Sequence, residues 1–202
     1  EDVSGGVSFK QEGTNFTNSL LVGHSNTGTL NAATNNTGVG IAALDALTSA
    51  DYNTAVGRSA GSSINTASSN TLIGYAAGST LTGGGHATHI GTNAGSADTG
   101  GSNTSVGKDS QKRNASGVGN VSVGREALEG VASNNHSYNT AMGFKSNELI
   151  TTGGYNLTLG AYAGDNLTTG AGNIIIGTAD AAAVDSARTL KITSYDGTTT
   201  TN

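Results

Sequence analysis

Ten glycines recur along the chain at an almost constant interval of about 17 residues, and such self-similarity at a fixed period is the signature of a repeat architecture. Each glycine closes a short phrase close to Asn-Thr-x-Val-Gly, as in residues 53–57 and 103–107. A repeat this short cannot bury its apolar side chains alone. It is typical of a solenoid, in which each repeat forms one coil stacked on the next. The repeat glycines are Gly23, Gly40, Gly57, Gly74, Gly91, Gly107, Gly124, Gly143, Gly160 and Gly177.

The composition agrees with a repeat fold better than with an ordinary globular domain. Only 34% of the residues are hydrophobic, whereas about 45–50% is usual for globular domains. Glycine accounts for 32 of the 202 residues. A flexible linker would have a similar composition, but a linker has no reason to return valine or isoleucine to one phase of a fixed period. The periodicity therefore favours an ordered solenoid.

The composition also disfavours several classes of protein. The formal charge of −5 is spread along the chain and offers no basic patch to nucleic acid. No apolar run approaches the length of a membrane-spanning helix, so we expect no membrane insertion. Cysteine is absent, which excludes disulfides and thiolate metal sites. The first residues lack the features of a signal peptide and an initiator methionine, so we expect a segment of a longer protein.

The apolar residues of each repeat predict a strand and its buried face. The residue before each glycine is apolar and the residue two positions earlier is usually Thr, so both lie on one face of a strand. We expect this face to point into the solenoid and the residue between them to point outward, as for His89. A second apolar position, seven residues after the glycine, includes Leu47 and Ile64 and predicts a second strand per coil. Two strands per coil indicate a flattened parallel β-roll.

Asparagine opens the repeat phrase in eight of the ten repeats. Identical amides stacked at a coil spacing of roughly 4.8 Å can hydrogen-bond to one another as a ladder. Each such bond contributes about 1 kcal/mol. A sugar-binding role for the same row is the alternative, and we favour the structural one. The ladder residues are Asn36, Asn53, Asn70, Asn103, Asn120, Asn139, Asn156 and Asn173.

The two ends of the chain depart from the repeat. We expect residues 1–18 to form an N-terminal cap or junction, with residues 7–9 as a capping strand, and residues 19–180 to form the solenoid. Residues 181–202 are expected to hold a C-terminal cap strand, at 188–195, and a connection to a following domain. The interior of such coils is thin, so association of several copies is the natural way to stabilise them. We expect a parallel homotrimer.

The phrases at residues 52–61 and 172–177 resemble the repeats of bacteriophage tail fibres, and they are similar to the head repeats of trimeric autotransporter adhesins. The resemblance extends over about residues 19–180. It implies an all-β, left-handed parallel β-solenoid of about ten coils that assembles as a homotrimer. The function that it implies is structural and adhesive: the shaft or host-facing module of a virion tail fibre, in contact with a cell-surface glycan or protein receptor. The alternative is the head of an adhesin on the bacterial surface. Adhesin-head repeats are usually shorter than the repeat of this chain, which favours the phage fibre.

Catalytic and metal-binding arrangements are not evident in the sequence. His86, His89 and Asp98 lie close in sequence but lack the further ligands of a zinc site. The nearest carboxylate pairs, Asp45 with Asp51 and Glu126 with Glu129, are expected on the solvated surface rather than in a glycosidase site. We therefore expect no catalytic residue, no metal and no cofactor, and we predict that the chain is not an enzyme.

Two further surface features have competing interpretations. The tyrosines near the repeat phrase either contact a receptor or pack between chains of a trimer, and we favour packing or plain surface exposure over receptor contact. A row of threonines would suit ice binding if it faced outward, but it shares its face with the apolar row and is expected to be covered. Ice binding is therefore a less favoured alternative. The tyrosines are Tyr52, Tyr75, Tyr138 and Tyr155.

Overall fold

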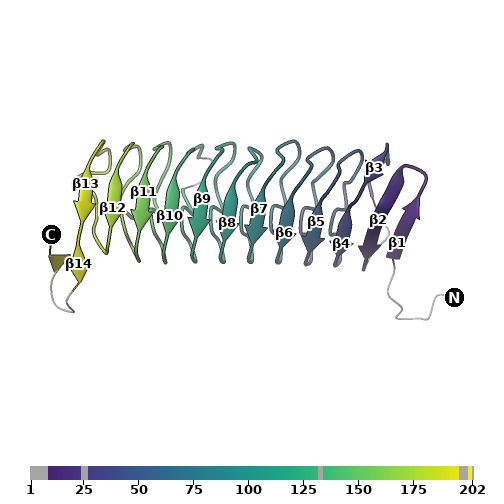
Figure 1. Ribbon diagram of the computed structural model, residues 1–202, viewed down its shortest axis with the longest axis horizontal. Coiled ribbons are helices and arrows are strands. Elements are labelled where there is room, and N and C mark those ends of the chain that lie inside the picture. The colour runs from purple at the N-terminus through teal and green to yellow at the C-terminus, as the bar shows by residue number, and fades with distance from the viewer. Residues whose placement is uncertain (1–8, 24–26, 132–133, 196–199, 202) are drawn as a thin grey trace.

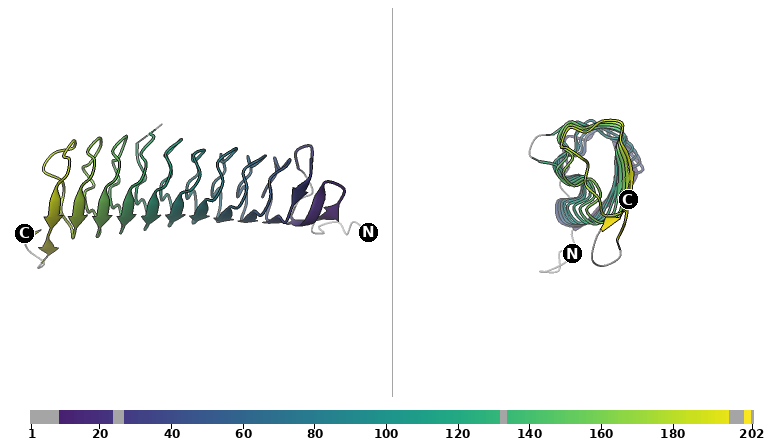
Figure 2. Two further views of the ribbon diagram at one scale, coloured as in Figure 1. Left: turned by 45° about the horizontal axis from the view of Figure 1, so that its top comes forward. Right: turned by 90° about the vertical axis from the view of Figure 1, so that its left-hand side faces the viewer.

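The protein is a rod of stacked coils, as the computed structural model shows (Figure 1). The structure describes residues 9–23, 27–131, 134–195 and 200–201. These residues form strands and turns and contain no helix. Seen end-on in Figure 2, the coils lie over one another around a common interior. The predicted all-β parallel β-solenoid of about ten coils is confirmed.

Each coil contributes one three-residue strand to a continuous parallel sheet. Neighbouring strands pair in register, so that Thr54 lies beside Thr71 and Ala55 beside Leu72. The repeat phrase thus forms the same rung in every coil. The strands are β4 (Thr37–Val39), β5 (Thr54–Val56), β6 (Thr71–Ile73), β7 (Thr88–Ile90), β8 (Thr104–Val106), β9 (Val121–Val123), β10 (Thr140–Met142), β11 (Leu157–Leu159), β12 (Ile174–Ile176) and β13 (Leu190–Ile192).

The second strand predicted for each coil is not formed. The segment around Leu47 and Ile64 consists of turns, although both side chains are buried. The reason is the backbone between the glycine and this apolar position. The second and fourth residues after the glycine have left-handed φ angles, 58° at both Ala42 and Leu44. Such residues interrupt an extended chain, so the prediction of a two-stranded roll was wrong.

The repeat glycines are required by the close stacking of the coils. All ten have positive φ angles, between 106° and 139°. A Cβ atom on Gly57 would lie 2.4 Å from the carbonyl oxygen of Gly74, and the same clash recurs along the row. Glycine is the one residue that combines this φ angle with so close an approach of backbone to backbone.

The sheet has its faces the opposite way round from our prediction. The middle residue of each strand points inward, and Ala55, Leu72 and His89 are fully buried. The apolar residues before the glycines point outward, so that Val56 is 37% and Ile73 38% exposed. A period-two pattern separates two faces of a strand but does not state which one is covered. The predicted inner face of the strands and the outward orientation of His89 were therefore wrong.

Side chains from the strand and from the following turns fill the interior of each coil. Their sizes compensate one another. A large strand residue occurs with a glycine four positions after the repeat glycine, as Leu72 does with Gly78, whose added Cβ would lie 2.7 Å from the leucine Cδ2. A small strand residue occurs with a large turn residue in the coil of Gly38 and Leu44. In the coil of Ala55 and Gly61 both residues are small, and the Leu72 side chain of the next coil approaches Gly61. This exchange keeps the interior filled.

The two ends are built differently. At the N-terminal end, β1 (Phe9–Gly13) and β2 (Phe16–Val22) form an antiparallel hairpin that covers the first coil, and β3 (Ala33–Thr34) pairs with β2. Residues 7 and 8 of the predicted capping strand lie outside the described residues. At the other end, β13 continues the parallel sheet, and β14 (Ser194–Tyr195) pairs antiparallel with β15 (Thr200–Thr201).

Candidate interaction surface

The outer face of the parallel sheet is an uncharged strip that follows the whole stack. We call it the outer sheet face. It consists of the first and third residues of each strand, from Leu20 and Val22 of β2 to Leu190 and Ile192 of β13. None of these residues is charged, and most are Thr, Val, Ile or Leu. An exposed apolar strip of this length is typical of an interaction surface. Its most exposed apolar members are Leu20, Val39, Val56, Ile73, Val121, Met142, Leu159, Ile174, Leu190 and Ile192.

Many of the charged side chains lie instead on the turns that follow the glycines, where they form ion pairs between and within coils. Asp109 contacts Lys108 at 2.5 Å and Lys112 at 3.0 Å. Burial would raise the pKa of Asp109, but hydrogen bonds from Lys108, Asn93 and Lys112 lower it to about 2. The charged turns and the uncharged outer sheet face are thus different surfaces of the same rod.

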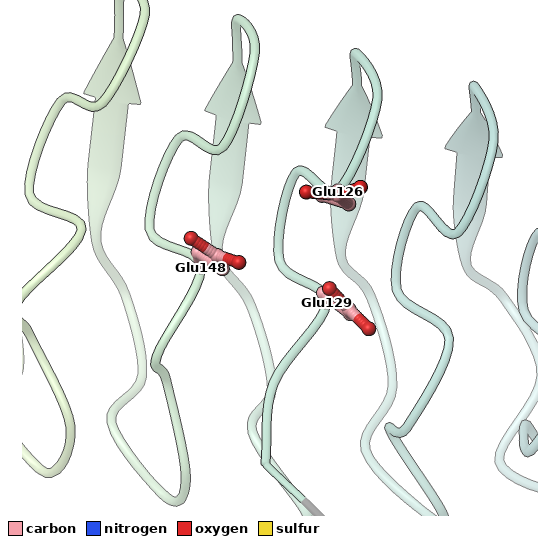
Figure 3. A group of neighbouring side chains, drawn as sticks. All are labelled: Glu126, Glu129 and Glu148. Carbon is pink, nitrogen blue, oxygen red and sulfur yellow. The ribbon is translucent and has the colours of Figure 1, made fainter.

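Three glutamates gather on these turns (Figure 3). Ligand atoms of Glu126, Glu129 and Glu148 lie within 4.8 Å of one another. Each carboxylate has a cationic partner: Glu126 contacts Arg125 at 2.7 Å, Glu148 contacts Lys145 at 2.9 Å, and Glu129 contacts the guanidinium of the arginine at position 113. The cluster is therefore an ion-pair network, with a positive side chain for each negative one.

Burial and ion pairing act in opposite directions on these glutamates. Burial raises the pKa of Glu129 above its usual value despite the nearby Arg113. At Glu126 burial also raises the pKa, but hydrogen bonds from Arg125 and Lys145 outweigh it and lower the pKa overall. Both glutamates are 8% exposed. The prediction that they are solvated surface charges was wrong, because stacking places each against the long side chains of neighbouring coils.

The asparagine row is a hydrogen-bonded ladder inside the rod. Asn53 donates from Nδ2 to Asn36 Oδ1 and to the Ala67 carbonyl oxygen, both at 3.0 Å. Its Oδ1 accepts from Nδ2 and the backbone N–H of Asn70, at 2.8 and 3.1 Å. All eight asparagines are at most 2% exposed. The amides therefore bond within the protein and offer no surface to a sugar. Ala87 stands where the ladder between Asn70 and Asn103 is interrupted.

The four tyrosines singled out in the sequence are all exposed, but only two of them come together. Tyr138 and Tyr155 stack with ring centroids 5.1 Å apart and an angle of 17° between the rings. Tyr75 lies beside the guanidinium of Arg58, with 5.7 Å between the ring centroid and Cζ. Tyr52 is 63% exposed. Tyr52, Tyr138 and Tyr155 each stand two residues before a strand, at the border of the outer sheet face.

A buried His–Asp pair lies in the interior and was missed in the sequence. His89 Nε2 is 3.1 Å from Asp98 Oδ2, and both side chains are fully buried. His86 is exposed, so the three residues considered for zinc do not converge. A signal was present: Asp98 and Asn114 occupy the otherwise apolar position seven residues after the glycine. Polar residues at that position indicate a polar interior at those coils.

Comparison of the chain with known protein families, with curated proteins and with solved structures finds no match. The described residues contain no apolar helix of membrane-spanning length. The surfaces and the interior of the rod are therefore the basis for inferring a function.

Proposed function

We propose that this chain is a structural and adhesive fibre protein that assembles as a parallel homotrimer, forming the shaft or host-facing module of a bacteriophage tail fibre. The observation that carries this proposal is the outer sheet face, an uncharged apolar strip along the whole rod. The head of a trimeric adhesin on a bacterial surface is the alternative, because it would use the same strip in the same way.

A second copy of the chain is the partner that best fits the outer sheet face. Each coil presents two outward residues of similar character, so parallel copies can align coil against coil along the full length. Burying the strip would add apolar contact to a rod whose interior is narrow. Closed rotational symmetry is the usual arrangement of identical chains. Three strips facing one axis would leave the charged turns in water.

Adhesion would follow from the shape of such an assembly. A stiff trimeric rod presents every turn and every exposed tyrosine three times, which supports multivalent binding to a cell-surface glycan or protein receptor. The stacked pair Tyr138 and Tyr155 places two exposed aromatic rings side by side. The proposal involves no catalysis, metal or cofactor.

The structure also supplies an observation in favour of ice binding. Thr37, Thr54 and Thr71 lie on the outer sheet face rather than inside, and repeated threonines on a flat sheet suit an ordered water lattice. However, the adjoining row is Val or Ile, and β11 to β13 carry Leu or Ile in place of Thr. A partly apolar strip fits a protein interface better than a lattice of water.

Native mass measured by light scattering tests the proposal. We expect three times the 19.8 kDa of one chain. Val123→Asp, on the outer sheet face, should give a folded monomer with unchanged β circular dichroism. Ser79→Asp is the matched control, because Asp45 occupies the same repeat position on a charged turn, and it should remain trimeric.

A monomeric wild-type chain would contradict the trimer. An ice-recrystallisation assay on that monomer would then decide whether the threonine row acts on ice. If the chain is a trimer, binding of the labelled trimer to bacterial cells, with and without competing surface polysaccharide, tests adhesion. Absence of binding to any host cell would count against a host-facing module and leave the shaft.

A further inference from the structure

The interior of the rod changes character at its centre. Between Ala87 and Ala127 the described interior contains one buried hydrophobic residue, Ala94. We call residues 88–131 and 134–150 the central coils. Their interior includes a small apolar group around Leu128 and Ile150, but most of it is polar. The fully buried polar residues are His89, Asp98, Asn103, Ser105, Ser110, Gln111, Asn114, Asn120, Ser122, His136, Asn139, Ser146 and Asn147.

Part of this interior is well bonded. Asp98 accepts hydrogen bonds from His89 Nε2, from Asn103 Nδ2 at 3.0 Å and from the backbone N–H of Gly100 at 2.8 Å. Gln111 Oε1 accepts from Ser105 Oγ at 3.1 Å. The carboxyl group of Asp98 is thus held by His89 and Gly100 of its own coil and by Asn103, which precedes the strand of the next coil.

The remainder is not fully bonded. Six buried side-chain atoms have no hydrogen-bond partner within the described protein, and all six belong to the central coils: His89 Nδ1, Gln111 Nε2, Asn134 Oδ1, His136 Nε2, Asn147 Nδ2 and Asn147 Oδ1. Each buried polar group without a partner costs free energy. These unpaired groups lower the free energy that is needed to open the central coils.

His136 is a titratable side chain in the interior of the central coils. It is fully buried, its Nδ1 lies 3.4 Å from Asn120 Oδ1, and its Nε2 has no partner in the protein. Protonation would therefore place a charge in a buried layer, and the hydrogen bond to the Leu128 backbone that favours the protonated ring has a smaller effect than burial. Burial lowers the pKa of His136 to about 4, with weaker opposing effects from the Leu128 backbone and from the charge of Asp98.

The charged groups around His136 do not compensate its charge. Asp98, on the interior side, is already held by His89 and Asn103. On its own coil, Glu126 and Glu129 lie at the turn and pair with Arg125, Lys145 and Arg113. On the next coil, Lys145 also pairs with Glu148. On the preceding coil, Asp109 pairs with Lys108 and Lys112.

We propose that the central coils are an acid-sensitive joint in the rod, which opens when His136 is protonated while the apolar coils on its N-terminal side stay closed. The direction follows from linkage. A histidine whose pKa is lower in the folded than in the unfolded state stabilises the fold above the unfolded pKa, and this stability is lost as the pH falls through that value towards the folded pKa. The window lies between about 6.5 and about 4.

Hydrogen exchange measured by mass spectrometry on the full chain tests this proposal. After correction for intrinsic exchange, the opening constant of peptides within the central coils should rise about 30-fold between pH 7.5 and pH 5, as expected for a pKa that is lower by 2.5 in the closed state. Peptides from residues 33–87 should change by less than about threefold over the same range. His136→Leu should largely abolish the difference between the two pH values.

Two further variants make the test decisive. His136→Gln keeps a donor for Asn120 without a titrating ring, so it should also abolish the pH response if the leucine variant fails to fold. His86→Gln changes an exposed histidine in the preceding coils and should leave the response intact. Unchanged protection of the wild-type central coils at pH 5, or an equal loss along the whole rod, would overturn the proposal. So would a full pH response in both His136 variants.

Discussion

The N-terminal coils and the central coils share one backbone and differ in what fills it. In residues 16–87 the interior is a continuous apolar cluster that includes Phe16, Leu44, Ile64 and Leu81. In the central coils the same positions hold His89, Asp98 and other polar groups. The glycine row continues through both regions, with φ angles of 132–139° from Gly40 to Gly143. The coil is therefore determined by its backbone stacking, and the chemistry of its interior can vary.

What is preserved between the two regions is volume. Leu72 lies with Gly78 in the apolar coils, and His89 lies with Gly95 in the central coils, where an added Cβ would be 2.4 Å from the histidine ring. In the next coil the strand residue, Ser105, is small and the turn residue, Gln111, is large, and Ser105 donates a hydrogen bond to Gln111. Packing density constrains side-chain size in both regions, whereas a layer that includes its own hydrogen-bond partners can be polar.

The largest loss of stability is expected when a charge is moved into the apolar region. Leu72→Asp places a carboxylate among Leu44, Ile64 and Leu81, where no donor replaces those that hold Asp98. An unpaired buried charge typically costs roughly 4 kcal/mol or more. We expect the variant to lose its β circular dichroism at temperatures at which the wild type remains folded.

Ser79→Asp is the control for this substitution. It adds the same charge to the turn that follows in the same coil, at the repeat position that Asp45 occupies in its own coil. Its melting temperature should fall far less than that of Leu72→Asp, because the half-buried Ser79 loses only its Oγ hydrogen bond to the Ser96 carbonyl oxygen, which contributes about 1 kcal/mol. Equal melting of Leu72→Asp and Ser79→Asp would show that the interior assignment is wrong.

A double-mutant cycle on the buried pair probes the central coils with an intermediate effect. Asp98→Leu alone leaves His89 and Asn103 without their acceptor and should destabilise by about 3 kcal/mol, as expected when one partner of a buried polar pair is removed. His89→Leu with Asp98→Leu rebuilds the layer of Leu72, Gly78 and Leu81, since Gly95 is already present. The double variant should recover most of the lost stability.

Thermal and denaturant unfolding of the two single variants, the double variant and the wild type give the coupling energy. If the double variant is as unstable as Asp98→Leu, then volume is not what the two regions share. The carboxylate would in that case be required by the turn at Gly100, whose N–H it accepts.

The features that could be predicted from the sequence are those that repeat with the period. The coil number, the glycine row and the asparagine row follow from spacing alone, because stacking places equivalent residues side by side. The inward orientation of Leu72 and His89 could not be predicted, since an alternating pattern does not state which face of the strand points inward unless the turns are known. The turns depend on left-handed residues such as Ala42 and Glu126, whose identities do not require that conformation.

The residues of the outer sheet face could accordingly be predicted to share one face of a strand, but that face was predicted to be the inner one. The row that includes Val56 and Ile73 is apolar in every repeat, which predicts an interior position. An apolar row is also what an interface between chains requires, and the sequence of one chain does not distinguish the two. The polar interior is indicated in the sequence only by Asp98 and Asn114, the two polar residues at the otherwise apolar position seven residues after the glycine. Two such residues do not suffice to predict that His136 lies near them.

The smallest expected effect comes from repairing the ladder at the boundary between the two regions. Ala87 donates its backbone N–H to Asn70 Oδ1 at 2.9 Å, in the way that the ladder asparagines do, but it has no amide to continue the row. Ala87→Asn would supply that amide and link Asn70 with Asn103. One additional buried hydrogen bond contributes about 1 kcal/mol, which raises the melting temperature of a domain of this size by about 2–4 °C.

Asn53→Ala is the converse experiment, because it introduces into the apolar coils the gap that exists naturally at Ala87. It removes bonds to Asn36, Asn70 and the Ala67 carbonyl and should lower the melting temperature by more than Ala87→Asn raises it, since each partner left buried and unpaired costs about 1–3 kcal/mol. If Ala87→Asn instead destabilises the rod, the gap is a necessary accommodation of the buried Asp98 layer. The boundary between the two regions would then be set by the polar interior, and not by a missing rung.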